Sequence, residues 1–381
     1  MHGDGVGLPR AVWGCPECGQ RMHGHGHEER RWRHLDRCQF KTRIVCRVPR
    51  VRCPEHGTQQ VAVSWAEKLS RFTRLFERLA IDVLLECSVL ATGELLRISW
   101  DEADGIKQRA VARGLARKPT DGSRRVCVDE KSAGRGQDYL TIVAKVQPGQ
   151  SATVDYVGEG RTQATRDEYW QGLTPEQRAG VEAVGMDLWE PYWTSTVSPV
   201  PGAVGKIVHD PFHLVRYMNE ALNEVRQSEQ TRLRAAGQET LTGTKPLWLY
   251  GYENLPADRA AEFKRLKAQR LQTSRAWAIK ELVRDFWDCE SLGEGRRFFQ
   301  RWYDWAIRSR LSPVKKVARM FRRHLENILT FFAHRLSNAS SEGLNNKIQS
   351  LVKKAYGYRN RQRFKTDILF HLGGLNLYPS P

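Results

Sequence analysis

The spacing of apolar residues changes several times along the chain, and each change predicts a different kind of element. Between residues 72 and 117, apolar positions recur at helical spacing, which predicts three short helices. Three apolar runs follow, at 125–130, 139–146 and 151–157, joined by segments that contain Gly and Pro. Such closely spaced runs predict an antiparallel meander of three strands.

Two more apolar runs, at 181–189 and 203–209, extend the meander into a mixed sheet. Asp187 lies near the end of the first of these runs, and Asp210 directly follows the second. Asp129 has a similar place near the end of the first strand of the meander. Because strand ends line the crevices of open sheets, these acids are candidates for a functional site.

Residues 214–332 contain almost no strand pattern and predict a helical block with long segments such as 286–305 and 314–332. Within this block, residues 296–326 carry ten basic and two acidic residues interleaved with aromatic ones. The pattern is compatible with phosphate contacts that aromatic rings support. The alternative is an ordinary solvated helix pair whose aromatic rings pack inward.

The C-terminal part opens with Ser and Asn residues that can cap a helix beginning near Ser340, with Glu342 in its first turn. Between Glu342 and Asp367 there are seven Lys or Arg residues and no acid. A lone carboxylate at the border of a basic surface is unusual for a structural residue. Glu342 is therefore a third candidate acid.

Residues 91–112 have the pattern of a helix-turn-helix. The second helix begins after a short turn, and Ser99 is placed to cap it. We expect this helix to carry Lys107, Arg109 and Arg113 outward, toward DNA. The alternative is a helical linker that enters no groove.

The composition adds a strong positive charge. Among the 381 residues, 61 Lys and Arg oppose 43 Asp and Glu, a formal net charge of +18. This excess indicates a polyanionic partner, above all nucleic acid, because bound phosphates release their counterions. The alternative is general solubility or attraction to acidic membrane surfaces.

Two further observations concern the compartment. No apolar run reaches the roughly 18 residues of a membrane span, and no secretory signal is visible. We therefore expect a soluble, cytoplasmic protein with reduced cysteines and no membrane partner.

The cysteines are concentrated near the start, where five of the eight lie within the first 53 residues. Two turns there have the same shape, Cys-Pro-Glu-Cys and Cys-Pro-Glu-His, and their spacing predicts a tetrahedral zinc site. The expected ligands are Cys15, Cys18, Cys53 and His56. Cys38 or Cys46 in place of His56 is the alternative. Four protein ligands leave no open position, so this zinc would be structural.

Asp129, Asp187 and Glu342 together have the chemistry of a divalent-metal site. Carboxylate oxygens are hard ligands that suit Mg²⁺ or Mn²⁺, and two such ions can hold the attacking and leaving oxygens of a phosphodiester in line. From spacing alone, however, the 43 acidic residues offer many other triples.

Several motifs in the chain resemble those of a known family. They are the N-terminal knuckles, Val-Asp129-Glu-Lys, Gly-Met-Asp187, His209-Asp-Pro-Phe-His213, Ser341-Glu342-Gly-Leu-Asn-Asn-Lys-Ile348 and Tyr356-Gly-Tyr-Arg-Asn360. Through these motifs the chain resembles, nearly end to end, the bacterial insertion-sequence transposases of the DDE type, ISL-three family. The last two motifs are the most specific.

The resemblance implies a multidomain α+β protein whose RNase H-like mixed α/β catalytic core is interrupted by an all-helical insertion. Asp129, Asp187 and Glu342 become the catalytic metal ligands, with Asp210 and His213 in support, and Asp210 is the strongest rival carboxylate. The role of Glu130 stays open. The expected segments are a zinc-binding module at 1–65, a helix-turn-helix region at 66–120, the first part of the core at 121–213, the helical insertion at 214–332, and the C-terminal core helix with its basic tail at 333–381.

The activity implied is metal-dependent cleavage at the element's terminal inverted repeats and transfer of the freed 3′ ends to target DNA. A homodimer or larger synaptic complex at the bacterial nucleoid would pair the two ends. The zinc module and the helix-turn-helix would recognise the repeats, and further DNA contacts are expected from Lys347, Lys353, Lys354 and Arg359. Two alternatives are a non-catalytic DNA-binding regulator derived from a transposase, and a metal-dependent nuclease that cuts without joining.

Overall fold

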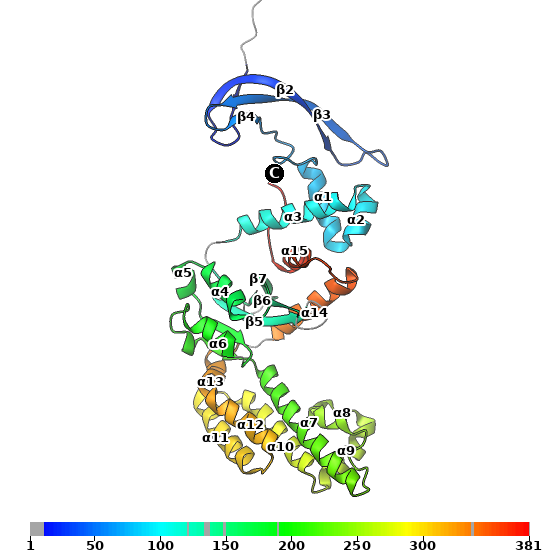
Figure 1. The fold of residues 1–381 in the computed structure, drawn as a ribbon, viewed down its shortest axis with the longest axis vertical. Coiled ribbons are helices and arrows are strands. Elements are labelled where there is room, and N and C mark those ends of the chain that lie inside the picture. The colour runs from blue at the N-terminus through cyan, green and yellow to red at the C-terminus, as the bar shows by residue number, and fades with distance from the viewer. Residues whose placement is uncertain are drawn as a thin grey trace, which may run out of the picture. The chain divides into compact units, whose positions relative to one another are not determined.

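The chain divides into two compact units (Figure 1). The first holds the residues up to Lys118 together with Gln362–Pro381, and the second holds Pro119–Arg361. The computed structural model describes residues 11–119, 122–132, 138–147, 150–188, 190–336 and 339–380, with the side chains of 339–342 outside the description.

The first unit begins with a long, narrow antiparallel sheet. Its strands, in the order β1-β2-β3-β4, are β1 (Val12–Gly14), β2 (Arg21–Arg33), β3 (Arg43–Cys53) and β4 (Gly57–Gln60). Its core is small: Trp32 and Val48 are buried, and the rings of Trp32 and Trp65 meet edge to face with centroids 5.6 Å apart. A sheet with so little apolar support is typical of modules that a metal ion stabilises.

Three helices follow, and a side chain caps each of them. They are α1 (Arg74–Glu86), α2 (Val89–Leu96) and α3 (Trp100–Ala116). Thr73, Ser88 and Ser99 accept hydrogen bonds from backbone N–H groups of the first turns, and Ser99 forms a capping box with Glu102. Arg97, between α2 and α3, has a left-handed φ of 54° that ends α2. The helix, turn and helix predicted over 91–112 are therefore present.

A helix from the end of the chain completes the core of these three. α15 (Arg361–Leu372) contributes Phe370 to a cluster that includes Phe76 of α1 and Ile106 of α3. The sequence predicts that all of 333–381 belongs to the catalytic core, whereas Gln362–Pro381 belongs to the first unit. The periodicity of a short helix shows which face is apolar, but not which element covers that face.

The second unit is built on one mixed sheet. Its strands, in the order β7-β6-β5-β8-β9, are β5 (Arg125–Ser132), β6 (Tyr139–Lys145), β7 (Thr153–Glu159), β8 (Ala183–Met186) and β9 (Ile207–His209). The first three form the predicted antiparallel meander, while β8 and β9 run parallel to β5. The last strand is shorter than predicted, because residues 203–205 form a 3-10 turn before it.

Three short helices connect the strands: α4 (Gln163–Gln171), α5 (Pro175–Ala179) and α6 (Glu190–Val197). Tyr169 and Trp170 of α4 and Tyr192 of α6 pack with Val128 and Val184 of the sheet. These aromatic side chains bury one face of the sheet.

The remaining helices of the second unit are α7 (Pro211–Ala235), α8 (Lys245–Leu249), α9 (Ala260–Ala268), α10 (Gln272–Arg284), α11 (Leu292–Arg308), α12 (Ser312–Arg323), α13 (Leu325–His334) and α14 (Ala339–Lys354), with 3-10 turns at 252–254, 257–259 and 285–288. Helices α7–α13 enclose a large core around Trp248 and Trp302. α13 is attached to the sheet, since Thr330 Oγ1 donates to the carbonyl of Ile207 at 2.5 Å.

The basic, aromatic stretch 296–326 falls on α11 and α12. Phe299 and Trp302 are buried there, and Arg296 of α11 pairs with Glu326 of α13 at 2.8 Å. The rings of Phe299 and Trp302 thus pack inward, as in the solvated-helix interpretation of this stretch, whereas Trp305 is 39% exposed. Among the helices in the described part of the chain, none combines the length and the apolar character that crossing a bilayer requires.

Candidate active site and metal centre

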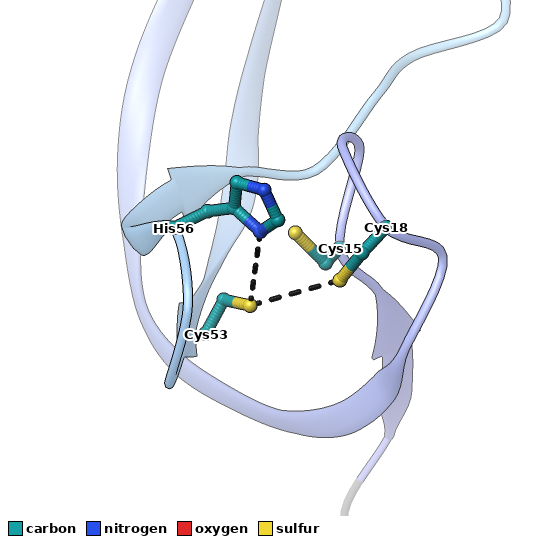
Figure 2. Close-up of side chains that lie close together, drawn as sticks. All are labelled: Cys15, Cys18, Cys53 and His56. Atoms are coloured by element: carbon teal, nitrogen blue, oxygen red, sulfur yellow. Dashed lines mark hydrogen bonds between the residues drawn. The ribbon is translucent and has the colours of Figure 1, made fainter.

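The four side chains predicted to bind zinc lie together (Figure 2). Cys15 and Cys18 come from the turn between β1 and β2, Cys53 ends β3, and His56 lies in the turn before β4. Their ligand atoms all lie within 4.8 Å of one another. Cys53 Sγ is 3.7 Å from Cys18 Sγ and 3.4 Å from His56 Nδ1.

These distances fit a tetrahedral zinc ion. Zn–S bonds of about 2.3 Å and Zn–N bonds of about 2.0 Å give tetrahedral edges of about 3.8 Å between sulfurs and about 3.5 Å between sulfur and nitrogen. Cys38 is exposed at the opposite end of the β2–β3 ribbon, and Cys46 faces Arg30 across it, so neither joins the cluster. The Cys₃His set suggests a structural zinc.

Two of the predicted catalytic acids lie at neighbouring strands of the second unit, Asp129 within β5 and Asp187 directly after β8. β5 and β8 pair in parallel with Cys127 opposite Gly185. Asp129 and Asp187 each follow that pair by two residues, so the register brings them to equivalent positions on one side of the sheet. Burial raises the pKa of the Asp129 carboxyl, and the nearby negative charge of Asp187 acts in the same direction.

Asp187 is held by the first turns of α7. Its Oδ2 accepts a hydrogen bond from Arg216 at 2.9 Å, and its Oδ1 accepts one from the Tyr217 hydroxyl at 3.3 Å. His213 places Nδ1 3.6 Å from Asp187 Oδ2 and Nε2 3.7 Å from Asp210 Oδ2. The two residues predicted as support, Asp210 and His213, are therefore beside Asp187. Sequence reasoning missed Arg216 and Tyr217, whose nearest signal is their helical spacing from His213.

Asp129 is held by α14, the helix that contains Glu342. Asn345 Nδ2 donates to Asp129 Oδ2 at 2.7 Å, and Lys131 Nζ donates to the carbonyl of Asn345 at 3.3 Å. Ile348 of the same helix is fully buried. The side chain of Glu342 itself lies outside the described residues. Sequence reasoning used Asn345 only as part of a motif and gave it no role.

Glu130 has surroundings different from those of Asp129. Successive side chains of a strand point to opposite faces of the sheet, and the carboxylate of Glu130 accepts a hydrogen bond from the Tyr192 hydroxyl of α6 at 2.7 Å. Burial raises the pKa of this carboxyl. Glu130 is thus a half-buried partner of α6 rather than a neighbour of Asp187.

The expected outward orientation of Lys107 is wrong. Lys107 is only 3% exposed, and its ammonium forms ion pairs with Asp367 of α15 and, at 3.5 Å, with Asp104 of α3. The physical reason is that Lys107 lies on the same face of α3 as the buried Ile106 and Ala110, which α1 and α15 cover. Asp104, an acid within this apolar stripe, was the available signal that a buried cation was needed.

Arg109 and Arg113 also turn toward α1. Arg109 Nε donates to Glu77 at 3.1 Å, while Arg113 bonds Glu67 at 2.9 and 2.6 Å and Glu77 at 3.0 Å. Glu77 is 1% exposed and would be costly to bury without these cations. The expectation that α3 carries these two residues outward is corrected as well, although the Arg109 side chain keeps 37% exposure.

The C-terminal basic residues do face solvent. Around the end of α14 the exposed side chains include Lys347, Lys353, Lys354 and Arg359. These four were the other predicted DNA contacts, and their positions are accessible to a polyanion.

Known protein families match most of the chain. Residues 126–368 match a family described as "Transposase", residues 11–56 match the "zinc-finger of transposase IS204/IS1001/IS1096/IS1165", and residues 61–111 match the "Helix-turn-helix domain of transposase family ISL3". The three matches follow one another in the order of the zinc cluster, the helical region and the mixed sheet.

The individual relatives that the chain matches are also transposases for insertion sequence elements. The chain is 28% identical to the transposase for insertion sequence element IS1557 in two strains of Mycobacterium tuberculosis, over 94% of this chain and 86% of that protein. It is 27% identical to the transposase for insertion sequence element IS1001 of Bordetella parapertussis, over 92% of this chain and 86% of that protein.

Proposed function

Because the chain belongs to the ISL3 family of insertion-sequence transposases, we propose that this protein cuts DNA at the ends of its insertion sequence and joins the freed ends to target DNA. The observation that carries the proposal is the parallel register of β5 and β8, which brings Asp129 and Asp187 side by side. Paired carboxylates at such a place have the chemistry of divalent-metal phosphoryl transfer.

An RNase H-like core with a helical insertion is the fold that we propose for the second unit. Two features support it. In the mixed sheet, β6 alone runs opposite to the other four strands, and helices α7–α13 lie in the chain between β9 and α14.

Asp129, Asp187 and Glu342 would hold the catalytic Mg²⁺ or Mn²⁺ ions. Burial and the nearby charge of Asp187 raise the pKa of the Asp129 carboxyl and so disfavour its charged form, and a divalent cation would relieve both effects. Glu342 precedes Asn345 by three residues, the spacing that places two positions on one helix face. Asn345 already reaches Asp129 from α14.

The metal ions would supply an activated water and stabilise the charge that develops on the phosphodiester. The chain's own residues position the ligands: Asn345 orients Asp129, while Arg216 and Tyr217 orient Asp187. Arg216 is also a cation beside the site that could contact a phosphate of the bound strand. His213 lies between Asp187 and Asp210, with Nδ1 3.6 Å from the first carboxylate and Nε2 3.7 Å from the second, and is assigned a supporting role for both acids.

The proposed partners are the terminal inverted repeats and target DNA. Recognition of the repeats is assigned to the zinc module and the helix-turn-helix, and backbone contacts to the exposed C-terminal residues Lys347, Lys353, Lys354 and Arg359. Pairing two ends requires a homodimer or larger complex. Such a substrate would place the protein at the bacterial nucleoid.

The test uses purified, zinc-loaded protein, Mg²⁺ and labelled DNA that carries the element's ends. We expect the wild type to cleave and join, and Asp187→Asn to lose both by at least about 100-fold, since it removes a ligand of the catalytic metal. Asp258→Asn, which neutralises an exposed acid of the helical block, is the matched control and should stay active.

Three results would contradict parts of this proposal. DNA binding without cleavage in the wild type, in Mg²⁺ and in Mn²⁺, would identify a non-catalytic regulator. Cleavage without joined products would identify a nuclease. Cleavage that Asp187→Asn leaves intact would remove Asp187 from the catalytic site.

A further inference from the structure

The loop between β2 and β3 ends in an exposed apolar side chain. Phe40 is 69% exposed, and across the turn the backbones of Arg37 and Phe40 exchange two hydrogen bonds of 3.1 Å. Cys38, inside this turn, has a left-handed φ of 53°, as the tightest hairpin turns require. We call residues 37–41 the tip loop. Its closed backbone holds the Phe40 ring out from the ribbon in a defined place.

The tip loop is fastened to the helix-turn-helix. Arg97, in the turn between α2 and α3, donates to the carbonyl of Gln39 at 2.6 Å and pairs with Asp36. At the base of the same loop, His34 Nδ1 lies 2.9 Å from the hydroxyl of Thr73, which caps α1. These contacts join the ribbon to the helices and bring the tip loop, with Phe40, to the turn that precedes α3.

The surroundings of Phe40 are cationic. Residues 37–54 contain six Lys or Arg and no Asp or Glu, and Arg37, Lys41 and Arg43 are exposed. The adjacent acid, Asp36, is already paired with Arg33 and Arg97. A protein partner that covered the apolar ring would have to desolvate these charges, whereas DNA would pair its phosphates with them.

The helix-turn-helix itself offers few cations that could pair with DNA phosphates. Lys107 and Arg113 are almost completely buried in ion pairs, and Arg109 is engaged with Glu77. A groove-binding helix normally needs phosphate contacts nearby to set its register. The tip loop is a cationic element fastened next to it.

We propose that the tip loop is a second DNA contact, in which Phe40 inserts between neighbouring base pairs beside the groove that α3 enters. Arg37 and Lys41 would pair with the flanking phosphates. Apolar wedges of this kind unstack one base step and bend the duplex, so they select easily deformed steps without hydrogen bonds to the bases. The inference rests on the proposed function, since it takes DNA as the partner of the helix-turn-helix.

The test uses the full, zinc-loaded chain and duplexes that carry the element's ends, with 2-aminopurine placed at successive steps. Phe40→Ala should weaken binding roughly 10-fold or more and abolish the fluorescence rise that reports unstacking. It should leave the salt dependence of binding unchanged, because no charge is lost. Arg37→Ala combined with Lys41→Ala should instead reduce the slope of log K against log salt by about 2.

Val45→Ala provides the matched control, because Val45 is another exposed apolar residue of the same ribbon, at 54% exposure. If Phe40→Ala and Val45→Ala bind and fluoresce like the wild type, the wedge is refuted while the proposed function stands. If the wild type binds no DNA, both fail. If Phe40→Ala keeps full DNA affinity but loses self-association in light scattering, the tip loop contacts a second protein copy and the DNA assignment is wrong.

Discussion

The ion pairs of Lys107 allow a quantitative prediction about the first unit. The Lys107 and Asp104 side chains are both 4% exposed, and Asp367 of α15 is 12% exposed. Lys107→Met would keep the apolar stem but leave two buried carboxylates without their ammonium partner. Breaking such a buried pair costs about 3–5 kcal/mol. Arg363, 3.3 Å from Asp104, compensates part of the loss, so we expect about 3 kcal/mol, the lower end of that range.

Hydrogen exchange followed by mass spectrometry measures this loss locally. Peptides from α3 and α15 of Lys107→Met should exchange about 100-fold faster than in the wild type, because the free energy of local opening falls by about 3 kcal/mol. Arg31→Met is the control: its pair with Glu29, at 3.0 Å, is exposed on both sides and contributes at most about 1 kcal/mol. Equal exchange in the two variants would refute the assignment of Lys107 to the buried core.

Two further predictions concern the zinc cluster and a buried histidine. Cys15→Ser should lower bound zinc from about one ion per chain toward zero and unfold the β1–β4 sheet, and unchanged zinc in elemental analysis would contradict the ligand assignment. Burial, aided by neighbouring His324, lowers the pKa of His209 to about 4. Between pH 6.5 and 4 the unfolded chain therefore binds more protons than the folded one. The free energy of unfolding should fall by about 3 kcal/mol as the pH drops through this range. In His209→Gln, hydrogen exchange of β9 should depend much less on pH over this range. A pH profile identical to that of the wild type would contradict the assignment of the effect to His209.

Local chemistry made much of the protein predictable from its sequence. The two Cys-Pro-Glu turns, the caps at Ser99 and the alternating runs of the meander depend on residues close in the chain. Short-range spacing controls metal geometry, first-turn hydrogen bonds and strand pairing across short loops. The sequence also identified Asp129 and Asp187 as acids near strand ends, although only the resemblance to a family singled them out among the other acids.

The tertiary structure decided which residues meet. Parallel pairing of β5 with β8 places Asp129 beside Asp187, and α14 returns from far along the chain to bring Asn345 to Asp129. Tertiary packing also decided which way the Lys107 side chain points. Because α15 packs on α3, Lys107 faces inward instead of toward DNA. The sequence by itself determined the zinc knuckles, the helices and the strands, because their hydrogen bonds and apolar periodicity are local. Burial and ion pairing depend on distant segments, so only packing could assign them.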